Sequence, residues 1–217
     1  MTFTKTLLSL CLMAAATIPT FAQAASADVT GLQQEWARIK YQVSGKDAQL
    51  QAIHALEETA AQTVAANPNS AEPMIWQGII LATDAGIVKG MSALGTVKQA
   101  KALFEKSLQL DPTALEGSAQ ASLGSLYYQV PGWPVAFGDD AKAEEHLKAA
   151  LKINPNGIDA NYFYGDFLLQ AKRYDEAVTY LNTALNAPAR AGRQVADAGR
   201  KQEIKQALAE AQKGLAK

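Results

Sequence analysis

Metal binding and acid–base catalysis are the first chemistries to test against the histidine and aspartate side chains of this chain. His54 and His146 lie far apart in the 217-residue sequence, and neither has a cysteine or a carboxylate at the spacing of a zinc site. Asp139 and Asp140 supply only two adjacent carboxylates, which suit the cap of the helix that follows better than a calcium site. The sequence therefore predicts no metal site.

Nucleophilic catalysis has no better support. The chain contains no G-x-S-x-G or HExxH motif, and the segment from Gly132 to Gly138 has neither a nucleophile nor the spacing of a phosphate-binding loop. We therefore expect no catalytic residues, no cofactor and no enzyme activity. The function that remains is binding, and it depends on how the chain positions its aromatic side chains.

The first 24 residues have the pattern of a secretory signal peptide. Lys5 precedes an apolar run over residues 7–18, and Ala22-Gln23-Ala24 is a small-residue cleavage site. A retained membrane anchor is the alternative, but the run is short of the roughly 20 residues that span a bilayer. Cys11, the only cysteine, raises the further question of lipid attachment. We expect cleavage after Ala24, a periplasmic product and no stable membrane insertion.

The rest of the chain, residues 26–217, has the length of a single domain. The formal net charge of the whole chain is −1, so no basic surplus is present to neutralise phosphates, and nucleic acid is excluded as a partner. Alanine, leucine, glutamine, glutamate and lysine dominate, and apolar residues recur at helical spacing. The fold class is therefore predicted to be all-α. We expect helices at residues 30–43, 46–66, 71–84, 96–110, 115–129, 140–153, 158–171, 174–187 and 195–215.

Four prolines close successive alanine-rich segments of the chain, and they are Pro68, Pro112, Pro155 and Pro188. Small residues recur before them in matching places, namely Gly78, Gly124 and Gly165 followed by Ala100, Ala143 and Ala177. This pattern resembles the tetratricopeptide repeat, a helix-turn-helix unit of about 34 residues. The resemblance implies an α-α superhelix in which each small residue lets the two helices of a pair approach closely.

The predicted repeats cover residues 71–112, 115–155 and 158–189. A degenerate helix pair at 30–68 precedes them, and a capping helix at 195–215 follows. Five basic residues take polar positions at or within that last helix, and they are Arg193, Arg200, Lys201, Lys205 and Lys213. We expect this helix to shield the last apolar face of the array.

Two repeats carry long insertions between their paired helices. Gly165 and Ala177 are 12 residues apart, whereas Gly78 and Ala100 are 22 apart and Gly124 and Ala143 are 19 apart. Insertions in a solenoid fall on one side of the array, so we expect residues 84–95 and 129–140 to lie near each other. Trp133 and Phe137 in the second insertion cover the mouth of a groove, present an anchor to a partner, or fill a gap between helices; we favour the last.

A more specific resemblance rests on the segments Tyr127–Ala143 and Asn154–Asp166. A proline-rich turn that leads to Gly-Asp-Asp and Lys-Ala at a helix start is similar to the T-component of TRAP transporters, a family of periplasmic helical-repeat proteins. The family implies association with a transporter solute-binding protein and binding of a small apolar ligand.

In a tetratricopeptide superhelix the first helix of each pair lines the concave groove. The resemblance places there a set of aromatic, apolar and acidic side chains and no lysine or arginine, which argues against a basic clamp for a carboxylate. Our candidate binding residues, together with the two loop aromatics, are Trp76, Ile79, Tyr128, Trp133, Phe137, Tyr162, Phe163 and Asp166. We expect a scaffold that recognises a protein or peptide partner; the alternative is a small-molecule binder that serves a TRAP-type solute transporter.

Overall fold

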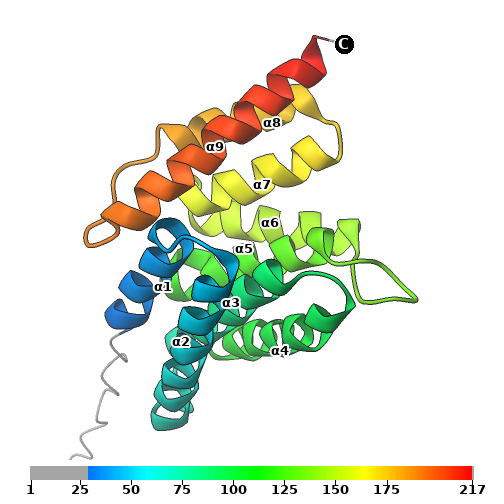
Figure 1. The fold of residues 1–217 in the computed structure, drawn as a ribbon. Helices are drawn as coiled ribbons and strands as arrows, with labels where there is room; N and C mark the ends of the chain where they lie inside the picture. The colour runs from blue at the N-terminus through cyan, green and yellow to red at the C-terminus, as the bar shows by residue number, and fades with distance from the viewer. Residues whose placement is uncertain (1–28, 217) are drawn as a thin grey trace, which may run out of the picture.

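The computed structural model describes residues 29–216, and these residues fold into nine α-helices and one 3₁₀ turn (Figure 1). The helices are α1 (Thr30–Gln42), α2 (Lys46–Ala66), α3 (Ala71–Val88), α4 (Leu94–Leu110), α5 (Ala114–Gln129), α6 (Asp140–Ile153), α7 (Ile158–Gln170), α8 (Tyr174–Leu185) and α9 (Gln194–Leu215). No strand occurs within residues 29–216. The predicted all-α helical-repeat fold is confirmed. The predicted signal peptide and Cys11 lie outside the described residues.

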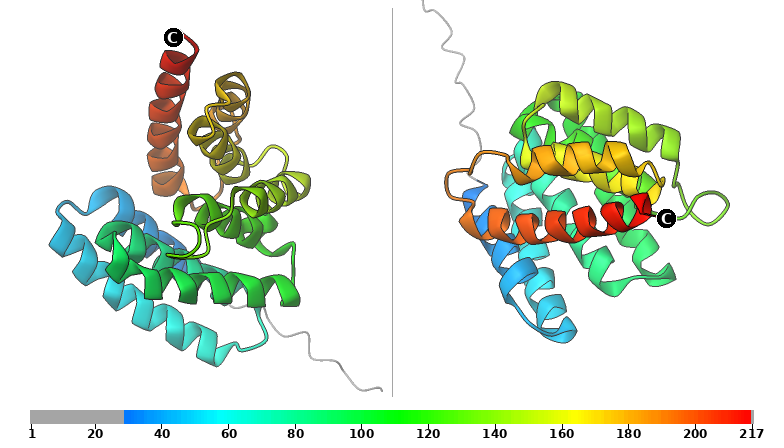
Figure 2. Two further views of the ribbon diagram at one scale, coloured as in Figure 1. Left: turned by 90° about the vertical axis from the view of Figure 1, so that its right-hand side faces the viewer. Right: turned by 90° about the horizontal axis from the view of Figure 1, so that it is seen from above.

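The helices form consecutive hairpins. α3 packs on α4, α5 on α6 and α7 on α8, and the first helix of the middle pair contacts the first helices of both neighbouring pairs. Successive helix pairs thus stack side by side, and each is rotated relative to the pair before it, as Figures 1 and 2 show. Every one of the four prolines Pro68, Pro112, Pro155 and Pro188 lies two or three residues beyond a helix end, where its missing N–H is harmless.

Three glycines allow the paired helices to touch. A Cβ atom on Gly78 would lie 2.6 Å from the ring of Phe104, one on Gly124 would lie 2.7 Å from Leu147, and one on Gly165 would lie 2.8 Å from Leu181. Ala100, Ala143 and Ala177, the small residues on the partner helices, are fully buried. The predicted role of the small residues is therefore correct.

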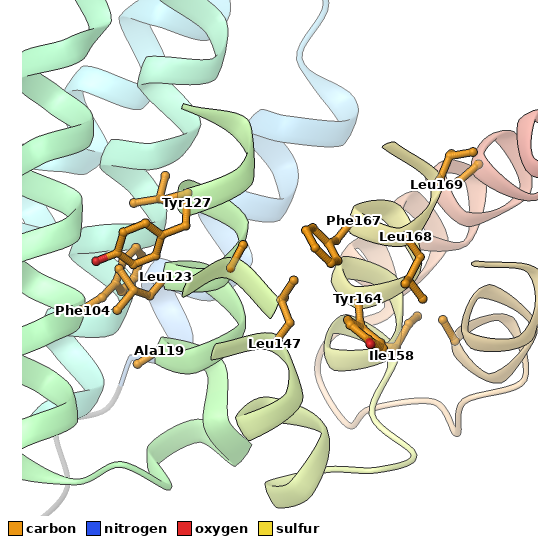
Figure 3. Close-up of a cluster of buried hydrophobic side chains, with 14 of the residues drawn as sticks. Phe104, Ala119, Leu123, Tyr127, Leu147, Ile158, Tyr164, Phe167, Leu168 and Leu169 are labelled. Carbon is orange, nitrogen blue, oxygen red and sulfur yellow. The ribbon is translucent and has the colours of Figure 1, made fainter. Parts of the chain in front are cut away.

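Phe104, Leu147 and Leu181 take equivalent places in the three repeats and form one continuous core with their neighbours. Figure 3 shows two parts of this core, with Phe104, Leu123 and Tyr127 on one side and Tyr164, Phe167 and Leu168 on the other. The aromatic residues of α7 pack on each other, since the rings of Tyr164 and Phe167 are 6.1 Å apart. The core therefore runs along the array instead of gathering at one centre.

The first insertion is more helical than predicted. α3 continues to Val88, four residues beyond the expected end, and a 3₁₀ turn at Met91–Ala93 leads directly into α4. Lys89 and Gly90 end α3 because both have positive φ angles, of 62° and 73°. The second insertion is a loop, and in Figure 1 it lies on the same side of the molecule as the connection from α3 to α4. Asp139 caps α6 as predicted, because its carboxylate accepts a hydrogen bond from the backbone N–H of Lys142.

The two ends of the array meet. α1 packs on α2 and α3 and also contacts α9, and Figures 1 and 2 both show it beside the first half of that helix. Lys40 forms an ion pair with Glu203 at 3.0 Å, and a Cβ atom on Gly199 would lie 2.2 Å from the ring of Tyr41. α9 buries Ile204, Ala207, Leu208 and Ala211 in the main core. Among the described helices none is long and apolar enough to cross a membrane.

Candidate binding site

A cavity of about 470 Å³ lies among α1, α3, α5, α7 and α9, where the first helices of the repeats face the two terminal helices. Its apolar and aromatic walls include Trp36, Trp76, Ile79, Ile87, Tyr162 and Phe163. Serines and one glutamine of α5 form another wall, and they are Ser118, Ser122, Ser125 and Gln129. The charged residues of the lining are Lys40, Asp159, Arg190, Arg193, Arg200 and Glu203.

Two tryptophans fix the apolar wall. The indole rings of Trp36 and Trp76 meet edge to face, with their centroids 5.6 Å apart. The indole N–H of Trp36 donates a hydrogen bond of 2.8 Å to the hydroxyl of Thr83, which holds α1 against α3. Only 4% of Trp76 is exposed. This wall is therefore rigid, because α1 and α3 are joined both by packing and by a specific hydrogen bond.

Six charged residues connect α1, α7 and α9, and we call them the charge network: Lys40, Asp159, Arg190, Asp197, Arg200 and Glu203. Asp159 accepts from Arg190 at 2.6 Å and from Arg200 at 2.8 Å. Glu203 accepts from Lys40 at 3.0 Å and from Arg200 at 2.5 Å. Arg190 also pairs with Asp197 at 2.7 Å. The network contains three cations and three carboxylates, so its charges balance.

The guanidinium groups control the protonation of Asp159. Burial alone would raise the pKa of its carboxyl, but the positive charges of Arg200 and Arg190 hold that pKa well below its usual value of 3.8. The carboxylate is therefore charged at every physiological pH, and it anchors both arginines.

We expect the low pKa of Asp159 to make the stability of the fold depend on pH. A folded-state pKa below the unfolded value means that Asp159 stabilises the fold above about pH 3.8, and that this contribution is lost as pH falls further. The thermal midpoint between pH 6 and pH 3 should fall less steeply in Asp159→Asn than in the native protein. Equal slopes in the two proteins would contradict the assignment.

The basic residues of the cavity correct one expectation. The groove was predicted to lack lysine and arginine, yet four of its lining residues are basic, and they are Lys40, Arg190, Arg193 and Arg200. They come from α1, from the connection between α8 and α9, and from α9, none of which belongs to the first helices of the three predicted repeats. Arg200, expected on a polar face of the capping helix, is buried instead. One sequence feature could have indicated that Arg200 forms ion pairs. It is the i, i+3 spacing of Asp197, Arg200 and Glu203 along one face of α9.

The other predicted site residues divide into two groups. Trp76, Ile79, Tyr162 and Phe163 line the cavity, and their contact with a bound molecule stays a prediction. Tyr128 and Asp166 are not among its lining residues. The hydroxyl of Tyr128 donates to the carboxylate of Asp166 at 2.7 Å, which joins α5 to α7. Burial raises the pKa of the Tyr128 hydroxyl, so the tyrosine remains protonated and acts as the donor, and burial also raises the pKa of the Asp166 carboxyl.

The two aromatic residues of the second insertion have different environments. Phe137 packs edge-on against Tyr127 at 5.7 Å, which agrees with the expected structural role. Trp133 does not fill a gap between helices, because 89% of its side chain is exposed. Trp133 lies within a tight turn, in which the N–H groups of Val135 and Ala136 both donate to the carbonyl oxygen of Gly132. Neither residue lines the cavity described above.

The two histidines belong to structural contacts. His54 lies 3.2 Å from a carboxylate oxygen of Asp84, and His146 lies 2.6 Å from the side-chain oxygen of Gln120 while its ring stacks on Tyr127. Within residues 29–216 no three His, Cys, Asp or Glu side chains gather in a way that could hold a metal ion.

Comparison with known families adds one match. Residues 135–201 match the model of the tetratricopeptide repeat, a range that includes α6, α7 and α8. A comparison with curated proteins finds no match. The family match and the helix-pair architecture together support a tetratricopeptide-repeat protein.

Proposed function

We propose that this helical-repeat protein, with its match to the tetratricopeptide repeat, is a binding scaffold that recognises a protein or peptide partner. The observation that carries the proposal is the cavity of the concave side, in which tryptophan, tyrosine and arginine side chains share one surface. These three residue types dominate the binding energy of protein interfaces. Tetratricopeptide repeats commonly bind protein partners, which supports the same conclusion.

The second insertion provides a further contact surface. The loop around Trp133 is held by backbone hydrogen bonds from Gly138 to Pro131 at 2.9 Å and from Val135 to Gly132 at 3.1 Å. A third bond, of 2.9 Å, joins the N–H of Asp139 to the carbonyl of Tyr127. An exposed tryptophan on a loop fixed in this way loses little conformational entropy on binding, so it suits the role of a hydrophobic anchor.

The cellular setting is part of the proposal. The signal-peptide pattern of the first 24 residues supports a periplasmic location. The resemblance of segments 127–143 and 154–166 to the TRAP transporter T-component supports a solute-binding protein as the partner.

A second candidate function is the binding of a small molecule. The observation in its favour is the contact between α1 and α9, which closes one side of the concave surface and leaves a cavity of about 470 Å³. Pockets for small ligands measure roughly 300–1,000 Å³. The charged lining does not suit the purely apolar ligand that the sequence resemblance implied, and it favours a ligand with both an apolar part and a charged group.

Site-specific photo-crosslinking in the native host tests the scaffold proposal. We would place a photo-reactive phenylalanine analogue at Gln129, an exposed residue of the cavity lining, and in a second variant at Trp133. Gln109, exposed on α4 and absent from the cavity lining, gives a matched control. We expect one partner chain to be captured from Gln129 and Trp133 and not from Gln109. Capture from all three positions alike, or from none, would reject the concave side and its loop as the recognition surface.

A further inference from the structure

Arg193 differs from the other basic residues of the cavity because it has no acidic partner. Lys40, Arg190 and Arg200 all pair with carboxylates of the charge network, whereas the side chain of Arg193 forms no ion pair or hydrogen bond with any described residue. Its Nε atom is buried without a hydrogen-bond partner. Since the network is already balanced, Arg193 adds one uncompensated positive charge to the cavity wall.

The nearest aromatic residue carries a second unused donor. The guanidinium of Arg193 lies over the indole ring of Trp76, with 5.0 Å between the guanidinium carbon and the ring centroid. Trp76 is almost fully buried, and its indole N–H has no acceptor anywhere in residues 29–216. A buried N–H without an acceptor destabilises the fold, so two such donors on one wall suggest that a ligand supplies the acceptor.

Both residues line the cavity of the concave side and also the neighbouring cavity of about 540 Å³. The electrostatic surroundings agree with their geometry. Burial and the positive charge of Arg190 lower the pKa of Arg193, and the negative charges of Asp159 and Asp197, which form no ion pair with it, oppose this shift only in part.

We propose that Arg193 and Trp76 bind the carboxylate of a small organic acid whose apolar part lies against Trp36 and Ile79. One unpaired cation matches one negative charge, which favours a monocarboxylate over a phosphate dianion. Trp36 and Ile79 belong to the same lining, so they offer an apolar surface beside the charged one. The proposal rests on the second candidate function, small-molecule binding, and is independent of the protein partner.

Titration calorimetry with phenylacetate, hexanoate and their neutral amides tests this inference on the protein that begins after Ala24. We expect at least one acid to bind, and its amide to bind at least tenfold more weakly, the difference expected from a hydrogen bond to a charged group. Arg193→Gln should weaken acid binding by a similar factor. Lys205→Gln removes the same charge from an exposed position on α9 and should leave binding unchanged. Trp76→Phe, which keeps an aromatic ring and removes the N–H, should weaken binding less than Arg193→Gln.

Several results would overturn the proposal. The first is equal binding of acid and amide to the native protein, a comparison that requires no variant to fold. The second is the absence of binding by both acids up to millimolar concentration. The third is unchanged acid binding in a folded Arg193→Gln protein. A tripeptide with a free carboxyl end that binds when neither acid does would assign the site to a chain terminus instead. Crosslinking of a partner from Gln129 would be unaffected, so failure here is distinct from failure of the scaffold proposal.

Discussion

Replacing Arg200 with methionine should lower the free energy of unfolding by about 3–5 kcal/mol, because it removes charge-assisted hydrogen bonds, each contributing roughly 1.5–3 kcal/mol, from two partly buried carboxylates. Arg200 is 7% exposed and bonds to Asp159 at 2.8 Å and to Glu203 at 2.5 Å. Its guanidinium carbon also lies 4.3 Å from the centroid of the Tyr162 ring, an arrangement in which a cation stabilises the fold further. Methionine preserves part of the volume and removes every one of the charged contacts.

Urea denaturation followed by circular dichroism measures this effect. Lys205→Met on the same helix is the matched control, since that lysine is exposed and its loss should change stability by less than about 0.5 kcal/mol. Adding Asp159→Asn to Arg200→Met should recover part of the loss, because it restores equal numbers of cations and carboxylates in the charge network. An Arg200→Met protein no less stable than Lys205→Met would show that the charge network does not join α7 to α9.

The second large effect concerns the core, where Phe104→Ala should cost about 3–5 kcal/mol of folding free energy. The side chain of Phe104 is fully buried and packs directly on the backbone of α3 at Gly78. Removing the ring leaves a void between α3 and α4 that the rigid helix pair cannot close. The midpoint of urea unfolding should therefore fall, with the steepness of the transition unchanged.

A second substitution tests whether the glycine and the ring depend on each other. Gly78→Ala alone should destabilise the protein, because the new methyl group would lie 2.6 Å from the ring of Phe104. In the Phe104→Ala background the same change should be neutral or stabilising, since alanine is the better helix former. Gly95→Ala on α4, with no atom within 4 Å of the added methyl, is the control and should stabilise both backgrounds. Equal effects of Gly78→Ala in both backgrounds would contradict the proposed contact.

The sequence predicts most of the fold because its signals are local. Pro112 and Pro155 lie just beyond helix ends, and Gly124 with Ala143 marks a close helix contact, so both can be recognised without knowledge of distant residues. The end of α3 is not marked by such a local signal, and the helix ends at Val88, four residues beyond the predicted end. Ala85 is buried by packing, and the helix continues until Lys89 and Gly90 turn the backbone, an ending that glycine spacing alone does not locate.

The candidate site was predictable only in part. Trp76 and Phe163 could be assigned to the concave side because the repeat register places them on first helices. Lys40, Arg193 and Arg200 could not, since their place in the cavity depends on the meeting of α1 with α9, which are separated by more than 150 residues. Periodicity within a helix reports which face is buried, and it carries no information on which distant helix covers that face.

The contact between α1 and α9 changes how the array of helices should unfold. In an open solenoid each unit stabilises only its neighbours, so unfolding can begin at either end and stop partway. Here the hydroxyl of Tyr41 reaches Glu203 at 3.3 Å, which makes the first and last helices neighbours as well. The last turn of α1 and the first half of α9 therefore support each other, and loss of one of these helices removes support from the other. An added repeat would also separate α1 from α9 and break the contact between them.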